Sequence, residues 1–165
     1  MQVLRILNEL EKRPRLESAP LTSLSDLLDS GMRGLKRRSL VFVVSDFFSA
    51  PGWEQRLERI ARRHETLAIR VADRREDELP DIGTVILTDS ETGEQLRVNT
   101  GDRRFRERFA SAARRREDLL NATFTRAGVD ALVLRTDEDM VRAIVKFAYA
   151  RKRRAGRRAA MGASA

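Results

Sequence analysis

Short apolar runs alternate along this chain with stretches in which apolar residues recur every three or four positions. Three such runs span Leu40 to Val44, Leu67 to Val71 and Ala131 to Leu134. The first is unbroken and rich in β-branched residues, which is typical of a strand buried on both faces. Helical spacing marks the segments 3–12, 21–35, 52–64, 102–126 and 138–150. Strands that alternate with helices predict a parallel sheet with right-handed crossovers, and therefore a three-layer α/β fold.

Polar and turn residues set the expected element boundaries. Thr22 or Ser23 is the candidate N-cap of the second helix, Ser49 with Pro51 that of the third, and Thr136 or Asp137 that of the last. After the second parallel strand, two short β-rich runs at 84–88 and 94–98 flank the turn-forming segment 89–93. This pattern predicts an inserted β-hairpin.

The first strand has an unusual expected position. Crossovers taken in order place the three parallel strands side by side in chain order, which leaves Leu40 to Val44 at an edge. Edge strands are usually short, charged or interrupted, whereas this run is the most apolar of the three. The sequence therefore predicts that the first two helices or a second copy cover it, or that it belongs to a larger sheet. An uncovered edge would favour a homodimer.

Length and charge favour one domain with a basic tail. A chain of 165 residues accommodates one domain, expected at 1–150. The formal charge is +8, but six basic residues lie in the acid-free segment 151–165; without them, 27 basic residues remain against 25 acidic ones, or about +2. We expect this tail to be disordered and to touch anionic partners weakly, so the charge does not make nucleic-acid binding the leading function.

The residue types exclude several kinds of chemistry. The chain has no cysteine and a single histidine, His64, so disulfides and thiolate metal sites are excluded and nucleophilic triads are disfavoured. His64 is expected at a helix C-terminus, where a partial positive charge interacts favourably with the helix dipole. There is neither an apolar stretch of about eighteen residues nor a basic-then-apolar leader. These features predict no membrane span and a cytoplasmic location.

An aspartate follows each apolar run: Asp46, Asp73 and Asp137. Parallel sheets collect binding groups beyond the carboxyl ends of their strands, so these acids are candidates for a metal or polar-ligand site. The alternatives are structural. Asp46 would form a turn, Asp73 would pair with a neighbouring arginine in its loop, and Asp137 would cap the last helix.

Segments from residue 38 to residue 154 resemble the C-terminal half of the domain-of-unknown-function-58 (DUF58) family, whose members carry a von Willebrand factor A-like domain. The resemblance is carried by Arg38 to Phe47, Arg63-His64-Glu65, Val71-Ala72-Asp73 with Glu78-Leu79-Pro80, and Asp89 to Glu94. Residues 2–12 are similar to the helix that precedes this half. The resemblance implies a partial von Willebrand A-like sheet from which the first, motif-bearing strand is missing, as in a truncated domain.

The resemblance also implies a metal site. In von Willebrand A domains an Asp-x-Ser-x-Ser motif, a threonine and a later aspartate hold a divalent cation, and Asp46 is similar to that later aspartate. Ser45 is its neighbour, and Asp73 could support the site from outside the ligand sphere. No Asp-x-Ser-x-Ser precedes Asp46. The implied Mg²⁺ site is therefore incomplete in this chain, since Mg²⁺ needs six oxygen ligands.

The expected function is a non-enzymatic protein-binding module. The resemblance implies partnership with MoxR-type AAA ATPases in a chaperone-like or complex-assembly role, with any Mg²⁺ acting in recognition. One alternative is a Mg²⁺-dependent phosphoryl-transfer or hydrolytic enzyme using Asp46 and Asp73, although the chain has no Gly-rich phosphate loop. The other is nucleic-acid binding through the tail and the arginine-rich segment 102–126.

Overall fold

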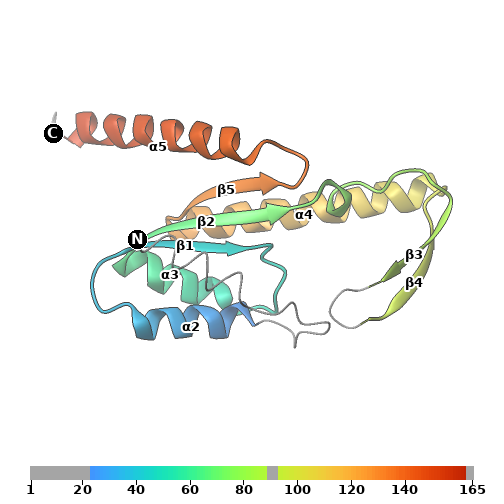
Figure 1. Ribbon diagram of the computed structural model, residues 1–165, viewed down its shortest axis with the longest axis horizontal. Helices are drawn as coiled ribbons and strands as arrows, with labels where there is room; N and C mark the ends of the chain where they lie inside the picture. Colours follow the sequence, from blue (N-terminus) through green and yellow to red (C-terminus); the bar gives the residue numbers. More distant parts are fainter. Residues whose placement is uncertain (1–22, 89–92, 163–165) are drawn as a thin grey trace.

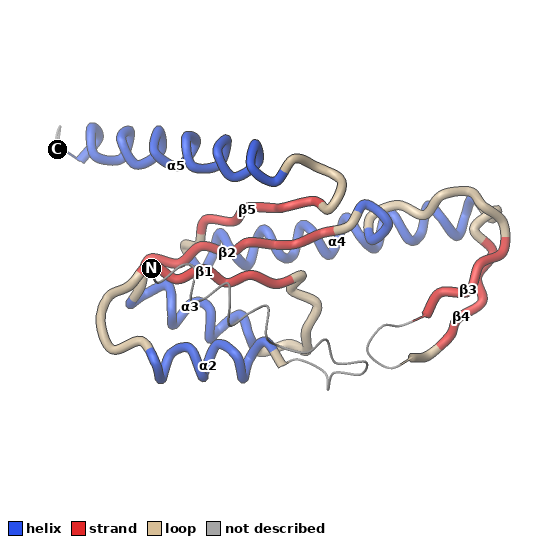
Figure 2. The backbone as a smooth tube through the Cα atoms, in the orientation of Figure 1, coloured by secondary structure: helices blue, strands red, loops and turns tan. Residues whose placement is uncertain are grey.

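A three-stranded parallel sheet forms the centre of the molecule (Figures 1 and 2). The computed structural model describes residues 23–88 and 93–162, with side chains as far as residue 154 in the second range. The strands lie in chain order: β1 (Leu40–Ser45), β2 (Glu65–Ala72) and β5 (Asp130–Arg135). A separate antiparallel hairpin pairs β3 (Thr84–Thr88) with β4 (Gln95–Asn99). The predicted sheet and inserted hairpin are confirmed.

Helices lie on both sides of the sheet, as the three-layer α/β prediction requires. On one side are α2 (Leu24–Gly34), α3 (Trp53–Arg63) and α4 (Arg103–Ala127), while α5 (Met140–Gly162) runs beside β5 on the other. Side chains alternate between the faces of a strand. In β2, Ala68 belongs to the core shared with α3 and α4, whereas Glu65 contacts α5 through Arg151.

The core lies between the sheet and the first three helices. Trp53, Leu57 and Ile60 place one face of α3 against it, and Leu120 and Phe124 do the same for α4. Gly128, with φ 67°, ends α4 in the left-handed conformation that favours glycine and donates its N–H to the last turn. Other buried members of the core are Leu24, Leu28, Val43, Phe47, Ala68 and Val129.

Two predicted helix caps are wrong. Ser23 caps α2 as expected, but α3 has Gly52 as its N-cap, while Ser49 accepts a hydrogen bond from the Leu24 N–H at 3.1 Å. Ser49 therefore joins α2 to the loop before α3. The carboxylate that accepts a hydrogen bond in the first turn of α5 belongs to Asp139, which receives the Arg142 N–H at 3.0 Å. A cap must lie next to the first turn, and Asp137 is two residues too early.

The last helix is longer than predicted. It was expected to end at about residue 150 and to be followed by a disordered tail, but α5 continues to Gly162. Arginine, lysine and alanine are strong helix formers, so their lack of a hydrophobic pattern did not prevent a helix. Arg151 also ties this segment to the sheet, because its guanidinium forms ion pairs with Glu65 of β2 and Asp130 of β5.

The outer face of β1 is exposed. Val43 points into the core and is 5% exposed, whereas Leu40, Phe42 and Val44 on the opposite face are 50%, 56% and 57% exposed. The prediction of a strand buried on both faces is therefore wrong for the described part of the chain. The predicted edge position is confirmed, since β2 is the sole strand paired with β1 among the described residues.

The hairpin projects away from the sheet near the N-terminal end of α4 (Figure 1). Its base is closed by Thr100, which is 1% exposed. The Thr100 N–H and hydroxyl both donate to the Gly83 carbonyl, at 2.7 and 2.8 Å, and the hydroxyl oxygen accepts the Ile82 N–H at 3.1 Å. Arg106 of α4 adds an ion pair with Asp81 at 3.1 Å.

The predicted helix at 3–12 and the turn at 89–92 lie outside the described residues.

Candidate functional site

Ser45 and Asp46 form a tight turn at the carboxyl end of β1. The Ser45 Oγ accepts the Phe47 N–H at 3.0 Å and the Asp46 Oδ1 accepts the Phe48 N–H at 2.9 Å. Between these bonds Phe47 has a φ of 61°, which is unfavourable for a residue with a side chain. The turn nevertheless buries the Phe47 ring in the core. In this geometry Asp46 acts as a turn-forming residue, and its metal role stays a prediction.

Asp73 links the ends of β2 and β5. Its carboxylate accepts the Arg75 N–H at 2.8 Å, capping the short 3₁₀ helix Arg74–Glu76, and the Thr136 hydroxyl at 2.7 Å. These two hydrogen bonds, the backbone one first, lower the pKa of Asp73 below its ordinary value because they favour the ionised form. The predicted ion pair with a neighbouring arginine is not found among the described residues; Asp73 contacts Arg75 through its backbone N–H, as a helix cap.

Removing the Thr136 hydroxyl is expected to raise the pKa of Asp73. In Thr136→Val the Arg75 N–H bond remains, so the pKa should stay below its ordinary value but rise towards it. A lowered carboxyl pKa contributes stability above the unfolded-state pKa, which is lost as the pH falls through the folded-state pKa. That loss should therefore be smaller in the variant and complete at a higher pH. A carboxyl NMR titration measures the change.

The control for this titration is Thr125→Val, which removes a hydroxyl that donates within α4, to the Asn121 carbonyl. It should leave the Asp73 titration unchanged. An unaltered Asp73 pKa in Thr136→Val would contradict the assigned hydrogen bond.

The described acids do not make up a complete metal site. Within residues 23–88 and 93–162, no group of three or more His, Cys, Asp or Glu side chains is placed to hold a metal ion. Asp46 and Ser45 use oxygen lone pairs on backbone N–H groups. Mg²⁺ needs near-octahedral oxygen coordination, so the described donors do not fit an ion held by this chain alone.

A buried charge network lies under this end of the sheet, on the α4 side. Arg70 of β2 is 2% exposed and donates to Glu117 of α4. Its second terminal nitrogen lies 4.0 Å from Glu76. Arg116 reaches the Glu76 carbonyl at 3.4 Å, and its guanidinium stacks on Phe48 at 4.1 Å. The turn after β1, the loop after β2 and α4 are thereby joined.

Burial raises the pKa of Glu76 above its ordinary value, and nearby Asp46 adds to this effect, while Arg70 and Arg116 act in the opposite direction. The Arg70 Nε, Arg116 Nε and Glu76 Oε2 atoms are buried and have no hydrogen-bond partner among the described residues. Sequence reasoning missed this network. Its signal was the arginine inside the apolar run Leu67 to Val71, because a charge at such a position needs a partner.

His64 also differs from its predicted role. It follows α3 at the predicted helix end, but it is 6% exposed, and its Nδ1 accepts the Ser39 N–H at 3.3 Å. His64 therefore joins the helix end to the chain entering β1.

The face of the sheet opposite the core carries an exposed apolar surface, which we call the open face. On β1 it consists of Leu40, Phe42 and Val44, and Val71 of β2, 40% exposed, lies on the same side. Helix α5, which runs beside β5, carries exposed apolar residues of its own: Met140, Val141, Ile144, Val145 and Tyr149. Exposed apolar patches mark interaction sites in many proteins.

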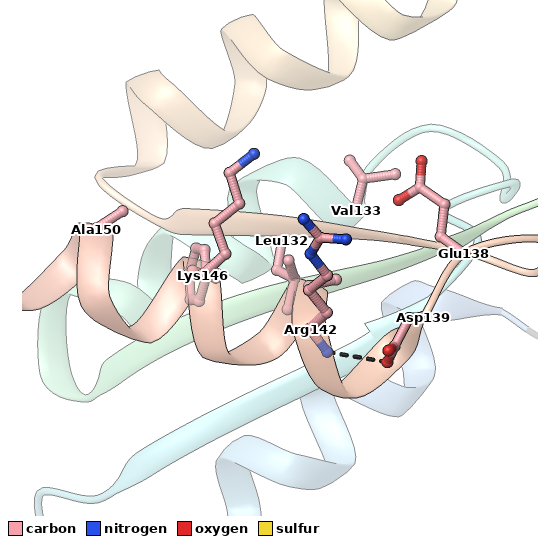
Figure 3. A pocket seen from close by; sticks show the side chains of 9 residues that line it. Leu132, Val133, Glu138, Asp139, Arg142, Lys146 and Ala150 are labelled. Atoms are coloured by element: carbon pink, nitrogen blue, oxygen red, sulfur yellow. Dashed lines mark hydrogen bonds between the residues drawn. The ribbon is translucent and has the colours of Figure 1, made fainter.

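A cleft of about 650 Å³ lies between β5 and α5. Leu132, Ala143 and Phe147 give it an apolar lining, and Figure 3 shows Arg142 and Lys146 extending from α5 at its rim. Glu138 and Asp139 also line the cleft, so its two basic residues are matched by two acidic ones and its charge does not favour an acidic ligand. None of these residues was a predicted site residue, because helical spacing alone does not show which side of α5 faces the sheet.

No helix in the described part of the chain has the length and apolar character needed to cross a membrane. No solved structure matches the chain.

Uncharacterized protein MAV169 of Mycobacterium avium is 39% identical over 148 residues, an alignment that covers 90% of this chain and 87% of that protein. Uncharacterized proteins Rv1480 of Mycobacterium tuberculosis and Mb1516 of Mycobacterium bovis are 36% identical over 148 residues. This chain spans 46% of their length.

The family model described as protein of unknown function DUF58 matches residues 1–119. This range begins before the segments at 38–154 on which the resemblance was based and ends inside α4. It includes β1, the turn at Asp46, Asp73 and the hairpin. The chain therefore belongs to the DUF58 family of proteins of unknown function.

Proposed function

We propose that this protein is a non-enzymatic protein-binding module that docks a partner on the open face and the exposed side of α5. The observation that carries the proposal is the exposure of Leu40, Phe42 and Val44 on a sheet face that α5 covers only beside β5. Burying such side chains contributes about 25 cal/mol per Å² of apolar area removed from water. A partner that covers this surface would gain the main driving force of protein association.

The proposed partner is a MoxR-type AAA ATPase, in a chaperone-like or complex-assembly role in the cytoplasm. This choice rests on the resemblance to von Willebrand A-like domains. Helix α5 also carries exposed basic residues, including Arg142 and Lys146 beside β5. The part of the partner that meets α5 should therefore include acidic groups, while the part that meets the open face should be apolar.

Mg²⁺ is proposed only for a complete domain in which further ligands join Asp46. It would then hold a coordination position open for a partner's carboxylate and so act in recognition.

The alternative of a Mg²⁺-dependent hydrolase using Asp46 and Asp73 gains no support from the geometry, since both carboxylates accept hydrogen bonds that hold their own loops. For the nucleic-acid alternative, Arg103 and Arg106 of α4 are paired with Glu107 and Asp81, and no contact in the structure favours this alternative over protein binding.

A binding measurement tests the proposed function. The purified chain is titrated against a purified MoxR-type ATPase from the same organism, and Ile144→Asp is compared with the wild type. Ile144 is 43% exposed on α5, so the change should leave the fold intact and put a charge in the apolar contact. We expect affinity to fall at least about tenfold, as for a central interface residue.

Leu119→Asp is the matched control. Leu119 is 70% exposed on α4, the helix on the opposite side of the sheet. The control variant should bind as the wild type does. Equal affinities for wild type and Ile144→Asp, or no binding by the wild type, would contradict the proposed function.

A further inference from the structure

We propose that α5 is a hinged arm held against the sheet by an ionic latch, and that screening of the latch charges releases the arm and opens the cleft beneath it. The latch consists of Arg151 and Arg154 of α5 with Glu65 and Asp130 of the sheet. The inference is independent of the ATPase partner, because every group of the latch belongs to this chain. Three observations carry it: the shallow burial of α5, the cleft beneath it and the position of its ion pairs.

Helix α5 is seated on the sheet without a buried side chain. Among its described side chains, residues 140–154, none is buried, whereas α2, α3 and α4 each bury at least two apolar side chains. The apolar residues of α5 that line the cleft towards β5 are half-buried: Ala143, Phe147 and Ala150. Burial of apolar surface is the main force that holds packed elements together. Charged contacts therefore carry a larger share of the attachment in α5 than in the other helices.

The cleft of about 650 Å³ separates α5 from β5 along this contact (Figure 3). Elements that interlock in a protein core leave few spaces larger than a water molecule. A cleft of this volume shows that the helix and the strand do not interlock here. Moving α5 away from β5 therefore does not require a close-packed core to be opened.

The two ends of α5 are attached in different ways. The turn at 136–139 connects its start to β5 through the chain itself, whereas the ion pairs lie about three helical turns further on. Arg151 pairs with Glu65 and, at 3.1 Å, with Asp130. Arg154 pairs with Asp130 at 3.4 Å. The turn is therefore placed as a hinge, and the ion pairs form a latch at the opposite end.

The latch is open to solvent and hence to salt. The Arg151 and Arg154 side chains are 33% and 66% exposed. Residues 140–162 contain eight basic residues and no acidic one, so the attraction depends on acids of the sheet. Exposed ion pairs contribute about 0.2–1 kcal/mol each, and about 1 M salt shortens the screening length to about 3 Å. Salt should therefore weaken the seat of α5 while the other three helices keep their buried contacts.

Thiol labelling measures the release of the arm. The chain contains no cysteine, so Ala143→Cys places a single half-buried thiol beneath α5, and Ala148→Cys places one on its exposed side as the control. Each variant is labelled with a maleimide at about 0.05 M and about 1 M NaCl. We expect the labelling rate of Ala143→Cys, divided by that of Ala148→Cys, to rise about fivefold with salt, because three exposed ion pairs weaken together.

Charge variants in the Ala143→Cys background test the latch at constant low salt. Arg151→Glu should raise the labelling rate about tenfold, because attraction to two acids becomes repulsion. Arg153→Glu is the matched control, since Arg153 is exposed and forms no ion pair with the described residues. It makes the same change in net charge and should keep the parent rate.

Reversal of every latch charge distinguishes the latch from a loss of packing. The variant that combines Glu65→Arg, Asp130→Arg, Arg151→Glu and Arg154→Glu restores each pair with the opposite sign, and it should return the rate to near that of the parent. Circular dichroism confirms that each variant is folded. Labelling of Ala143→Cys that does not change with salt would overturn the proposal. Equal rates for Arg151→Glu and Arg153→Glu, or a folded reversal variant that stays open, would also overturn it.

Discussion

Phe124→Ala is expected to lower the free energy of unfolding by about 4 kcal/mol, the typical cost of truncating a buried aromatic residue. Phe124 is 4% exposed in α4, and its ring meets Phe47 edge-on at 5.0 Å and lies 6.3 Å from Trp53. The loss combines burial, a cavity and the aromatic contacts. Phe47 depends on these contacts to hold its unfavourable backbone angle, so part of the loss should appear in the turn after β1.

Urea unfolding followed by fluorescence measures this effect directly. Trp53 is the single tryptophan of the chain, and its ring lies 5.3 Å from that of Phe47, so its emission reports on the cluster itself. Leu119→Ala in the same helix is the control, because that side chain is 70% exposed. It should change the free energy by no more than about 0.5 kcal/mol. Equal effects of the two substitutions would contradict the assigned core.

Glu117→Ala is expected to destabilise the protein by about 2–3 kcal/mol. Removing one partner of a fully buried ion pair costs about 3–5 kcal/mol, because the other charge stays buried. Arg70 is 2% exposed, but the Glu117 side chain is 32% exposed, and Glu76 still lies 4.0 Å from the guanidinium. Both facts reduce the cost below the fully buried value. Chemical denaturation at neutral pH measures it.

The control for this substitution is Glu107→Ala on the same helix. Glu107 pairs with Arg103 at 2.7 Å, but both side chains are exposed, at 59% and 83%, and such pairs contribute about 0.5 kcal/mol or less. The double variant Arg70→Met with Glu117→Gln should recover much of the lost stability, since it removes the buried charge together with its partner. If Glu117→Ala and Glu107→Ala were equivalent, Arg70 would not depend on Glu117.

The hydrophobic pattern predicted the elements but not what covers them. The run Leu40 to Val44 correctly indicated a strand, and crossover handedness correctly placed it at the edge of the described sheet. The prediction that both faces of this strand are buried was wrong. A continuous apolar run shows that a strand has two apolar faces, but it does not show which element covers each face. The same limit applies to α4, where Leu119 follows the apolar stripe and is nevertheless 70% exposed.

The candidate site was predictable where it depends on local geometry. Asp46 and Asp73 lie at strand ends. Turn formation was the alternative role for Asp46, and its hydrogen bond to the Phe48 N–H shows that role. For Asp73 the alternative was pairing with a neighbouring arginine, whereas its carboxylate accepts the Arg75 N–H and the Thr136 hydroxyl. The Asp73–Thr136 contact spans 63 positions of sequence, and such a contact requires the register of β2 and β5. The length of α5 was missed for a different reason, because charge composition was given more weight than the helix propensity of arginine and alanine.

The closed base of the hairpin makes that segment structurally separable. Because Thr100 bonds directly to Gly83 and Ile82, the chain leaves the sheet region and returns to it at nearly the same point. The hairpin residues between Gly83 and Thr100 therefore do not affect the course of the backbone from β2 to α4. A change in the length of the hairpin should therefore leave the sheet and the start of α4 in place.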